Sequence, residues 1–251
     1  MLAQHVEEAA RLLCEARAAA RPLAELPPDC RPRTDADAYR IQDAVVARLG
    51  EAVGGWKVRI ATITGAALCA PIFARTISPS PASFRGTRPV GVEAVLAFRL
   101  GRDLPPRAEV FHRAEATEGA SLHPAVELIE PRYADFRARD RAANLADNWS
   151  NGGLVLGGAI PDWRSLEMTH IRIEVRADGE PVAASGRSPP RDPVAALVDC
   201  ANLLGRRGGA KAGTVVAVMP WTELVFVAPG SRVAVDFGPL GQIDIDVPAA
   251  G

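Results

Sequence analysis

The 251-residue chain has few aromatic residues and almost no net charge, and both shortages argue against whole classes of function. Phe, Trp and Tyr make up 5% of the residues, too few for the stacking surfaces that bind single-stranded nucleic acid. The formal net charge is −1, so no basic surface is expected for nucleic acid or for an anionic membrane. No apolar run approaches the roughly 18 residues of a membrane span.

Cysteine is also scarce. The four cysteines, at positions 14, 30, 69 and 200, form neither a C-x-x-C pair nor a zinc-binding spacing. We therefore expect free, mostly buried thiols in a reducing compartment, and a cytoplasmic location. Charged residues interrupt the apolar pattern of the amino-terminal segment, so we expect no signal peptide.

Motifs of several enzyme classes are missing as well. No glycine-rich phosphate loop is present, which argues against nucleotide use. Ser150 lacks a flanking G-x-S-x-G, so a serine hydrolase is a weak hypothesis. What is present is an ordinary globular composition, with 48% hydrophobic and 24% charged residues. We expect one domain over residues 1–251, large enough to bury its own core.

Local patterns predict an α+β fold. Apolar residues at helical spacing predict a helix over 2–20, and a second helix begins after the N-cap Thr34 and ends at Gly50. These helices form a cap over residues 1–50 on a β-rich catalytic body over 55–247. We expect a mixed, mostly antiparallel β-sandwich or roll.

Further patterns predict the elements of the body. Asp178-Gly179 marks a hairpin, and Asp192-Pro193 starts a helix that runs to about 207. Another helix is expected over 107–119. Strands are expected over 56–62, 73–77, 90–100, 122–130, 169–175, 180–184, 214–219, 223–227, 231–237 and 243–247.

Glu93 lies in the strand over 90–100, and its neighbours define its face. Side chains alternate along a strand, so Glu93 and Val95 share one face, about 7 Å apart, while the residues at 92, 94, 96 and 98 face a core. A buried carboxylate is costly without a partner. We therefore expect Glu93 to belong to a site, and either a metal ion or Lys57 is its expected partner.

Other polar residues complete the candidate site. Glu127 alternates with apolar neighbours and could equally face solvent. His123 shares its strand parity and would favour a softer ion such as Mn²⁺ or Fe²⁺, although a packing histidine is the more ordinary interpretation. Asp147, Asn148 and Ser150 precede a double glycine, which is typical of a turn.

The ordered set of these segments resembles the 2-keto-4-pentenoate hydratase family, which lies within the fumarylacetoacetate hydrolase superfamily and includes 4-oxalocrotonate decarboxylase. The resemblance runs from about Thr34 to Val247. It rests on Gly55-Trp56-Lys57-Val58, on the strands around Glu93 and Glu127, and on the segment 146–157. It implies a body of the fumarylacetoacetate hydrolase C-terminal-domain type.

The resemblance also implies a site. Mg²⁺ or Mn²⁺ would be held by Glu93 and Glu127 and would stabilise an enolate as a Lewis acid. Lys57, Asp147 and Ser150 are the expected catalytic residues, and Asn148 and His123 the expected substrate-binding residues. The substrate would be a small 2-oxo or 2-hydroxy-dienoate acid.

The sequence departs from the family pattern at three places. Val95 stands where a second glutamate of the Glu-x-Glu strand is expected, so the metal would bind weakly or not at all. Ala70-Pro71-Ile72-Phe73 lacks an acid that relatives carry, and Met219-Pro220-Trp221-Thr222 replaces a turn of smaller residues.

The sequence leaves four functions open. They are a hydratase, a decarboxylase that loses CO₂ through the same enolate, a metal-free enzyme that uses Lys57 and Glu93, and a catalytically silent homologue. A homo-oligomer is expected, and a pairing with a related decarboxylase or hydratase is also compatible with the family.

Overall fold

The computed structural model describes every residue except 61–64, 66, 87, 169–170, 186–191 and 250–251. Among the described residues, no helix has both the length and the apolar character needed to cross a membrane. The helices are α1 (Ala3–Ala18), α2 (Asp35–Leu49), α3 (Arg113–Thr117), α4 (Arg141–Ala146) and α5 (Pro193–Gly205). The strands are β1 (Val53–Ile60), β2 (Ala67–Phe73), β3 (Ile77–Pro79), β4 (Ala82–Ser83), β5 (Val90–Arg99), β6 (Ser121–Ile129), β7 (Asn151–Leu156), β8 (Glu174–Ala177), β9 (Glu180–Ala184), β10 (Val215–Pro220), β11 (Val225–Val227), β12 (Arg232–Asp236) and β13 (Gln242–Asp246).

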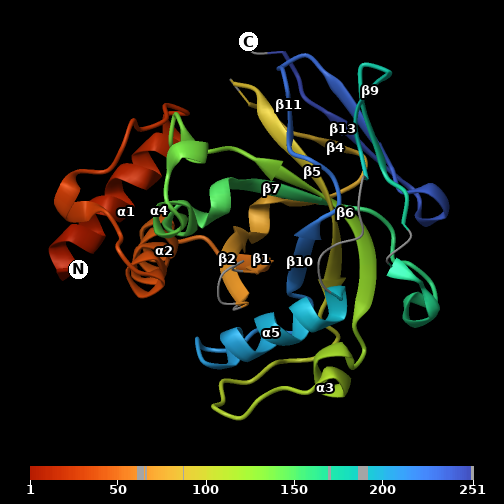
Figure 1. Ribbon diagram of the computed structural model, residues 1–251, viewed down its shortest axis with the longest axis horizontal. Coiled ribbons are helices and arrows are strands. Elements are labelled where there is room, and N and C mark those ends of the chain that lie inside the picture. The colour runs from red at the N-terminus through yellow and green to blue at the C-terminus, as the bar shows by residue number, and fades with distance from the viewer. Residues whose placement is uncertain (61–64, 66, 87, 169–170, 186–191, 250–251) are drawn as a thin grey trace.

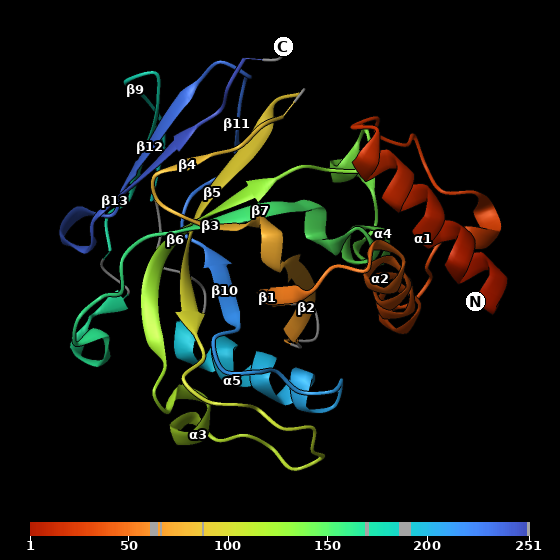
Figure 2. The ribbon, with the colours of Figure 1, turned by 180° about the vertical axis from the view of Figure 1, so that it is seen from behind.

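Two sheets form the body. The larger has the order β2-β1-β10-β5-β6-β7-β3, with β11 paired to β5, and the smaller has the order β4-β13-β12-β8-β9. Most pairings are antiparallel, but β1–β10, β3–β7 and β4–β13 are parallel. The amino-terminal helices lie on one flank of the body and the smaller sheet lies on the opposite flank (Figures 1 and 2). The expected mixed, mostly antiparallel α+β fold is confirmed.

Three apolar clusters hold these layers together. The largest lies between the two sheets and under α5, and it takes Val92, Leu96 and Phe98 from one face of β5. A second joins α1, α2 and α4 to β2. The third is small and contains Val95 and Ala97, from the opposite face of β5, with residues of β2, β6, β7 and β10. We call this side of the larger sheet the concave face.

Several local predictions are confirmed. The Thr34 hydroxyl accepts a hydrogen bond from the Asp37 amide (3.1 Å), and Gly50 ends α2 with a left-handed φ of 63°. Asp178 and Gly179 have φ of 53° and 88° between β8 and β9, as a tight hairpin requires. The strands around Glu93 and Glu127 and the helix after Asp192 also lie where the patterns placed them.

Two predicted elements are wrong. The helix over 107–119 is reduced to α3, because the Arg107 side chain donates to the Val110 carbonyl (3.0 Å) and holds 107–110 as an irregular turn. The strand over 73–77 is broken by a 3-10 turn over Ala74–Thr76 between β2 and β3. The predictions also missed β2, β3, β4, β7 and α4. Of the strand predicted over 169–175, only 174–175 fall in β8, and residues 169–170 lie outside the described residues. Residues 61–62 of the strand predicted over 56–62 also lie outside them.

Candidate functional site

Two glutamates face each other across the central strands of the larger sheet. Glu93 on β5 is the register partner of Glu127 on β6, and their side chains are 7% and 2% exposed. Directly opposite residues of antiparallel strands have Cβ atoms about 5 Å apart, and like charges there repel. Two buried carboxylates at this spacing need positive charge beside them.

Lys57 on β1 supplies part of that charge, although β10 and β5 separate β1 from β6 in the sheet. Its Nζ forms an ion pair with Glu127 and lies 3.7 Å from Oε2 of Glu93. On the intervening strands β10 and β5, the residues in register with Lys57 are Ala217 and Ala97. These small side chains leave room for the lysine to extend over the concave face, so its ammonium reaches both carboxylates.

Arg59 supplies the rest, and sequence reasoning missed it. Its Nη2 donates to Oε2 of Glu93 (3.2 Å), and its guanidinium carbon lies 5.6 Å from the centre of the Trp149 ring. The signal was available, because strand alternation puts residues 57 and 59 on one face. Lys57-Val58-Arg59 therefore aims two cations at the same surface as the two glutamates.

The charges of this cluster balance, with two cations against two carboxylates. Burial raises the pKa of Glu127 above its ordinary value, although Lys57 and Arg59 oppose the shift. Glu93, as a second negative charge, acts in the same direction as burial. The glutamates are thus neutralised by side chains of the chain itself.

This donor set does not fit a resident divalent cation. Val95, at the position of the expected third carboxylate, is 1% exposed and packs among Ala97, Ala125 and other apolar residues. The part of the chain that the structure describes contains no group of three His, Cys, Asp or Glu side chains able to hold a metal. A hard cation binds through carboxylate oxygens, and here Lys57 and Arg59 already neutralise both carboxylates.

The residues before β7 fold into a left-handed turn. Asn148, Trp149 and Ser150 have φ of 51°, 48° and 59°, and three such residues in succession are strained. Strain of this kind persists only where the surroundings fix the backbone. Here the Glu130 amide donates to the Ser150 carbonyl (2.7 Å), and the Ser150 amide donates to the Asp147 carbonyl (2.9 Å).

Asp147 anchors this turn through a buried ion pair with Arg132. Arg132 Nε contacts Oδ1 of Asp147, the Arg132 amide donates to Oδ2 (3.0 Å), and Nη2 donates to the Asp147 carbonyl (2.6 Å). Burial raises the pKa of Asp147, while Arg132 lowers it. Both carboxylate oxygens are bound, so the geometry makes Asp147 a positioning residue, and its catalytic role stays a prediction.

Asn148 and Ser150 are buried on either side of Trp149. Asn148 Oδ1 has no hydrogen-bond partner among the described residues. Ser150 lines a cavity of about 160 Å³ together with Arg59 and Trp149. The structure therefore brings Ser150 close to the cation that binds Glu93, whereas the substrate-binding role of Asn148 stays a prediction.

His123 lies at the other end of β6. It lies four positions before Glu127, a separation of about 13 Å along a strand. Its Nδ1 hydrogen-bonds to the Gly157 carbonyl (3.0 Å) and its Nε2 to the Ser121 hydroxyl (2.9 Å). Both ring nitrogens are engaged in hydrogen bonds at this end of the strand, so the geometry does not bring His123 to the glutamates.

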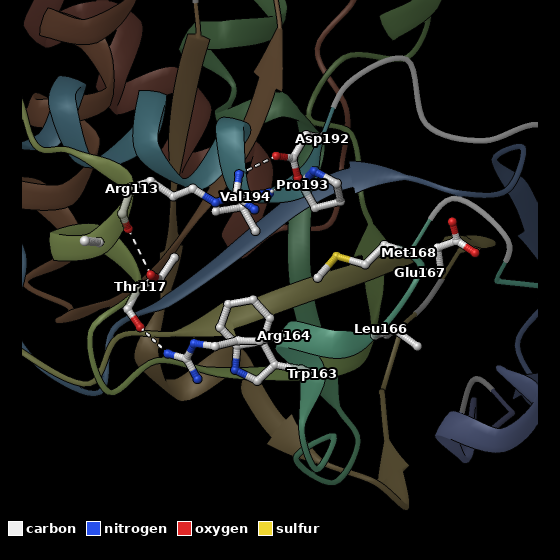
Figure 3. A pocket seen from close by; sticks show the side chains of 11 residues that line it. Arg113, Thr117, Trp163, Arg164, Leu166, Glu167, Met168, Asp192, Pro193 and Val194 are labelled. Atoms are coloured by element: carbon white, nitrogen blue, oxygen red, sulfur yellow. Dashed lines mark hydrogen bonds and ion pairs between the residues drawn. The ribbon is translucent and has the colours of Figure 1, made fainter.

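A larger cavity, of about 740 Å³, lies between α3, the 3-10 turn Trp163–Ser165 and the start of α5 (Figure 3). Its arginines are already engaged: Arg113 pairs with Asp192 (2.6 Å), and Arg164 donates to the Thr117 carbonyl (2.7 Å). A binding site is marked by convergent polar groups that remain available. The cavity beside Arg59 meets that criterion, so it is the better candidate.

Curated relatives match the chain over about half or nearly all of its length. The 2-keto-4-pentenoate hydratase of Paraburkholderia xenovorans (strain LB400) is 28% identical over 261 aligned positions, covering 97% of this chain and 95% of the relative. A 4-oxalocrotonate decarboxylase of Pseudomonas putida is 30% identical over 122 positions, 48% of this chain and 46% of the relative. No family profile matches the chain. The resemblance expected from the sequence is confirmed.

Solved structures confirm the fold. A 4-oxalocrotonate decarboxylase from Pseudomonas putida G7, complexed with magnesium and adipate, has a TM-score of 0.82 at 21% identity and covers 98% of each chain. A fumarylpyruvate hydrolase from Pseudomonas aeruginosa, in complex with Mn²⁺ and pyruvate, has a TM-score of 0.51 at 16% identity and covers 73% of this chain and 79% of that one. The chain therefore shares the fold of these two structures.

Proposed function

Because the chain is a relative of the 2-keto-4-pentenoate hydratases, we propose that it is a hydratase-type lyase. Its substrate is a small 2-hydroxy-2,4-dienoate or 2-oxo-enoate acid, to which it adds water. One observation supports this most: Lys57 is buried beside the paired glutamates on the concave face, and Arg59, which binds one of them, lines a small cavity. A fixed cation in such a place is arranged to stabilise negative charge.

The proposed reaction develops that charge. The dienol gives up its 2-hydroxyl proton to form an enolate, whose negative charge lies largely on the oxygen of carbon 2. A proton returns to carbon 5, and water then adds across the double bond between carbons 3 and 4, with its hydroxyl on carbon 4 and its proton on carbon 3. Lys57 lowers the energy of the enolate because its ammonium is held in place before the reaction begins. The turn at 148–150 places Ser150 at the cavity, where its hydroxyl can hold a substrate oxygen.

Metal binding is a separate part of the proposal. Two of those neighbours are complexed with magnesium and with Mn²⁺. For this chain we propose that Mg²⁺ or Mn²⁺ binds weakly or not at all, since Lys57 and Arg59 already neutralise Glu93 and Glu127. No step of the proposed reaction depends on a metal.

A decarboxylase is the second candidate. The observation that favours it is the TM-score of 0.82 to a 4-oxalocrotonate decarboxylase, over 98% of both chains. Loss of CO₂ leaves an enolate like that of the hydratase when the departing carboxylate is β to the 2-oxo group or joined to it through a conjugated double bond. The electron pair of the broken C–C bond then passes to the oxygen of carbon 2, so the same lysine would serve. A catalytically silent homologue within an oligomer is the remaining alternative.

The test is a spectrophotometric screen of dienol acids, with and without Mg²⁺ or Mn²⁺. A hydratase removes the dienol absorbance without releasing CO₂, whereas a decarboxylase releases CO₂. We expect Lys57→Met to lower kcat/KM by about a hundredfold or more, as the loss of an electrostatic stabiliser does. Lys211→Met is the matched control, because Lys211 forms an exposed ion pair with Asp103 far from Lys57 in the sequence. A folded protein that turns over no dienol acid would support the silent homologue.

A further inference from the structure

The cavity beside Arg59 carries two hydrogen-bond donors without acceptors. Arg59 Nε and Trp149 Nε1 are both buried, and neither has a partner among the described residues. Both residues line the same cavity of about 160 Å³. Buried donors are normally paired, so two unpaired donors at one cavity point to an acceptor that binds there.

The rest of the cavity suits a small acid. Its lining combines apolar and polar side chains: Ile129, Phe136 and Leu224 with Arg59, Arg137, Asn144, Trp149 and Ser150. Cavities for drug-sized ligands occupy about 300–1,000 Å³, so this one fits only a small molecule. A ligand with an anionic end and a short carbon chain matches both kinds of lining.

Arg59 is held so that most of its donors stay available. A guanidinium has five N–H groups, and the hydrogen bond to Glu93 (3.2 Å) uses one nitrogen, Nη2. The ring of Trp149, 5.6 Å from the guanidinium carbon, fixes the orientation of the plane. An arginine oriented in this way binds carboxylates well, because its N–H groups match two carboxylate oxygens.

We propose that Arg59 takes the place of a divalent metal: it neutralises Glu93 and, together with the indole N–H of Trp149, binds the carboxylate of the substrate acid. A divalent ion at Glu93 would have to displace this guanidinium. Substrate binding is therefore independent of metal. The identity of the acid rests on the proposed function, whereas the anion site can be measured without any turnover.

The first experiment measures binding of pyruvate, a small 2-oxo acid, by titration calorimetry in buffer with a chelator. We expect binding by the parent protein, a loss of at least tenfold in affinity for Arg59→Met, and a smaller loss for Trp149→Phe, which keeps the ring but removes the donor. Arg102→Met is the matched control, since Arg102 is an exposed arginine paired with Glu118, and it should bind as the parent does. Thermal melts establish that each variant is folded.

Equal affinities for the parent and a folded Arg59→Met would overturn the proposal. Pyruvate binding that appears only after Mn²⁺ is added would also overturn it.

The second experiment measures the thermal shift caused by Mn²⁺. The parent should show none, while Arg59→Ala should gain stability with Mn²⁺, because Glu93 then lacks its neutralising partner. An equal Mn²⁺ shift in both proteins would show that Arg59 does not stand in a metal's place. If pyruvate binding follows Arg59 and no dienol acid is turned over, the anion site stands and the proposed activity fails.

Discussion

Val95 is an uncharged residue on the same face as Glu93 and Glu127, and this affects the charge balance there. Its side chain packs with Ala97 and Ala125 in the small apolar cluster between the strands. A third carboxylate at this position would outnumber Lys57 and Arg59 and leave one negative charge unbalanced. The two cations balance the two carboxylates because position 95 carries no charge, so Val95 and Arg59 belong to one electrostatic arrangement.

Replacing Val95 tests this arrangement. In chelator, Val95→Glu should lower the free energy of unfolding by about 1–3 kcal/mol, because a new acid is buried among apolar groups. Mn²⁺ should recover part of the loss by mass action, and more of it when Arg59→Ala is added. Thermal melts across a Mn²⁺ titration measure both effects.

Val95→Gln is the control, since it has the size of glutamate without its charge. If Val95→Glu and Val95→Gln melt alike at every Mn²⁺ concentration, a third carboxylate does not make a metal site here.

At the scale of residues, the alternation of side chains along strands was the most useful signal for the site. What alternation cannot show explains which site contacts were not predicted. Alternation predicted that Glu93 belongs to a site and left Glu127 open to solvent, and the family resemblance brought the two together. The register pairing places them opposite each other. Alternation could not show that Lys57 spans two strands, since this depends on alanines at 97 and 217 that pairing brings into its path. Alternation also puts Arg59 on the same face as Lys57, but no motif marked Arg59 as a site residue.

At the scale of elements, the turn before β7 depends on Arg132. This arginine and Asp147 are each 2% exposed, and Arg132 also donates to the Asn151 carbonyl (2.9 Å) at the start of β7. The pair therefore connects the end of β6 to both ends of the left-handed turn. Sequence patterns predicted a turn here but not its partner, because Arg132 follows β6 with no spacing that links it to Asp147.

Asp147→Ala should be strongly destabilising. It leaves the buried Arg132 guanidinium without its counter-charge, and breaking a buried pair in this way costs about 3–5 kcal/mol. Adding Arg132→Met should restore part of the stability, since no lone charge then remains buried. Urea denaturation of the single and double variants measures the coupling.

The control is Asp103→Ala, which breaks the exposed pair with Lys211 and should have a much smaller effect. A small, additive effect of Asp147→Ala would mean that the turn is held by its backbone hydrogen bonds alone.

Helices and strands were predicted best where contacts between residues close in sequence determine them. Thr34, Gly50 and Asp192 fix helix ends by contacts within a few residues, and those ends agree with the prediction. The region 107–119 failed because Arg107 binds the carbonyls of residues 109 and 110 and the carboxylate of Glu115. These contacts compete with helix formation, and no periodic pattern records them.

At the scale of the whole molecule, the amino-terminal helices connect directly to the site. Their apolar cluster includes Phe73 of β2, and Trp149 packs against it. Gln42 of α2 donates to the Leu145 carbonyl (2.6 Å), and Arg17 of α1 donates to the Asn151 carbonyl (3.2 Å). The helices therefore support both ends of the turn that carries Ser150, which fits a cap on a single domain.

This connection predicts one cooperative unfolding transition. Leu13 of α1 is 3% exposed within the helical cluster, so Leu13→Ala should cost about 2–5 kcal/mol. Because the cluster includes β2, the loss should lower the midpoint seen by far-UV circular dichroism and by tryptophan fluorescence equally. The exposed Leu2 serves as control, and Leu2→Ala should change stability by less than about 0.5 kcal/mol.

The four tryptophans, at 56, 149, 163 and 221, all lie after the first 50 residues. A fluorescence transition that stays in place while the circular dichroism transition moves would show that the helices unfold as a separate unit, and residues 1–50 would then be a domain of their own.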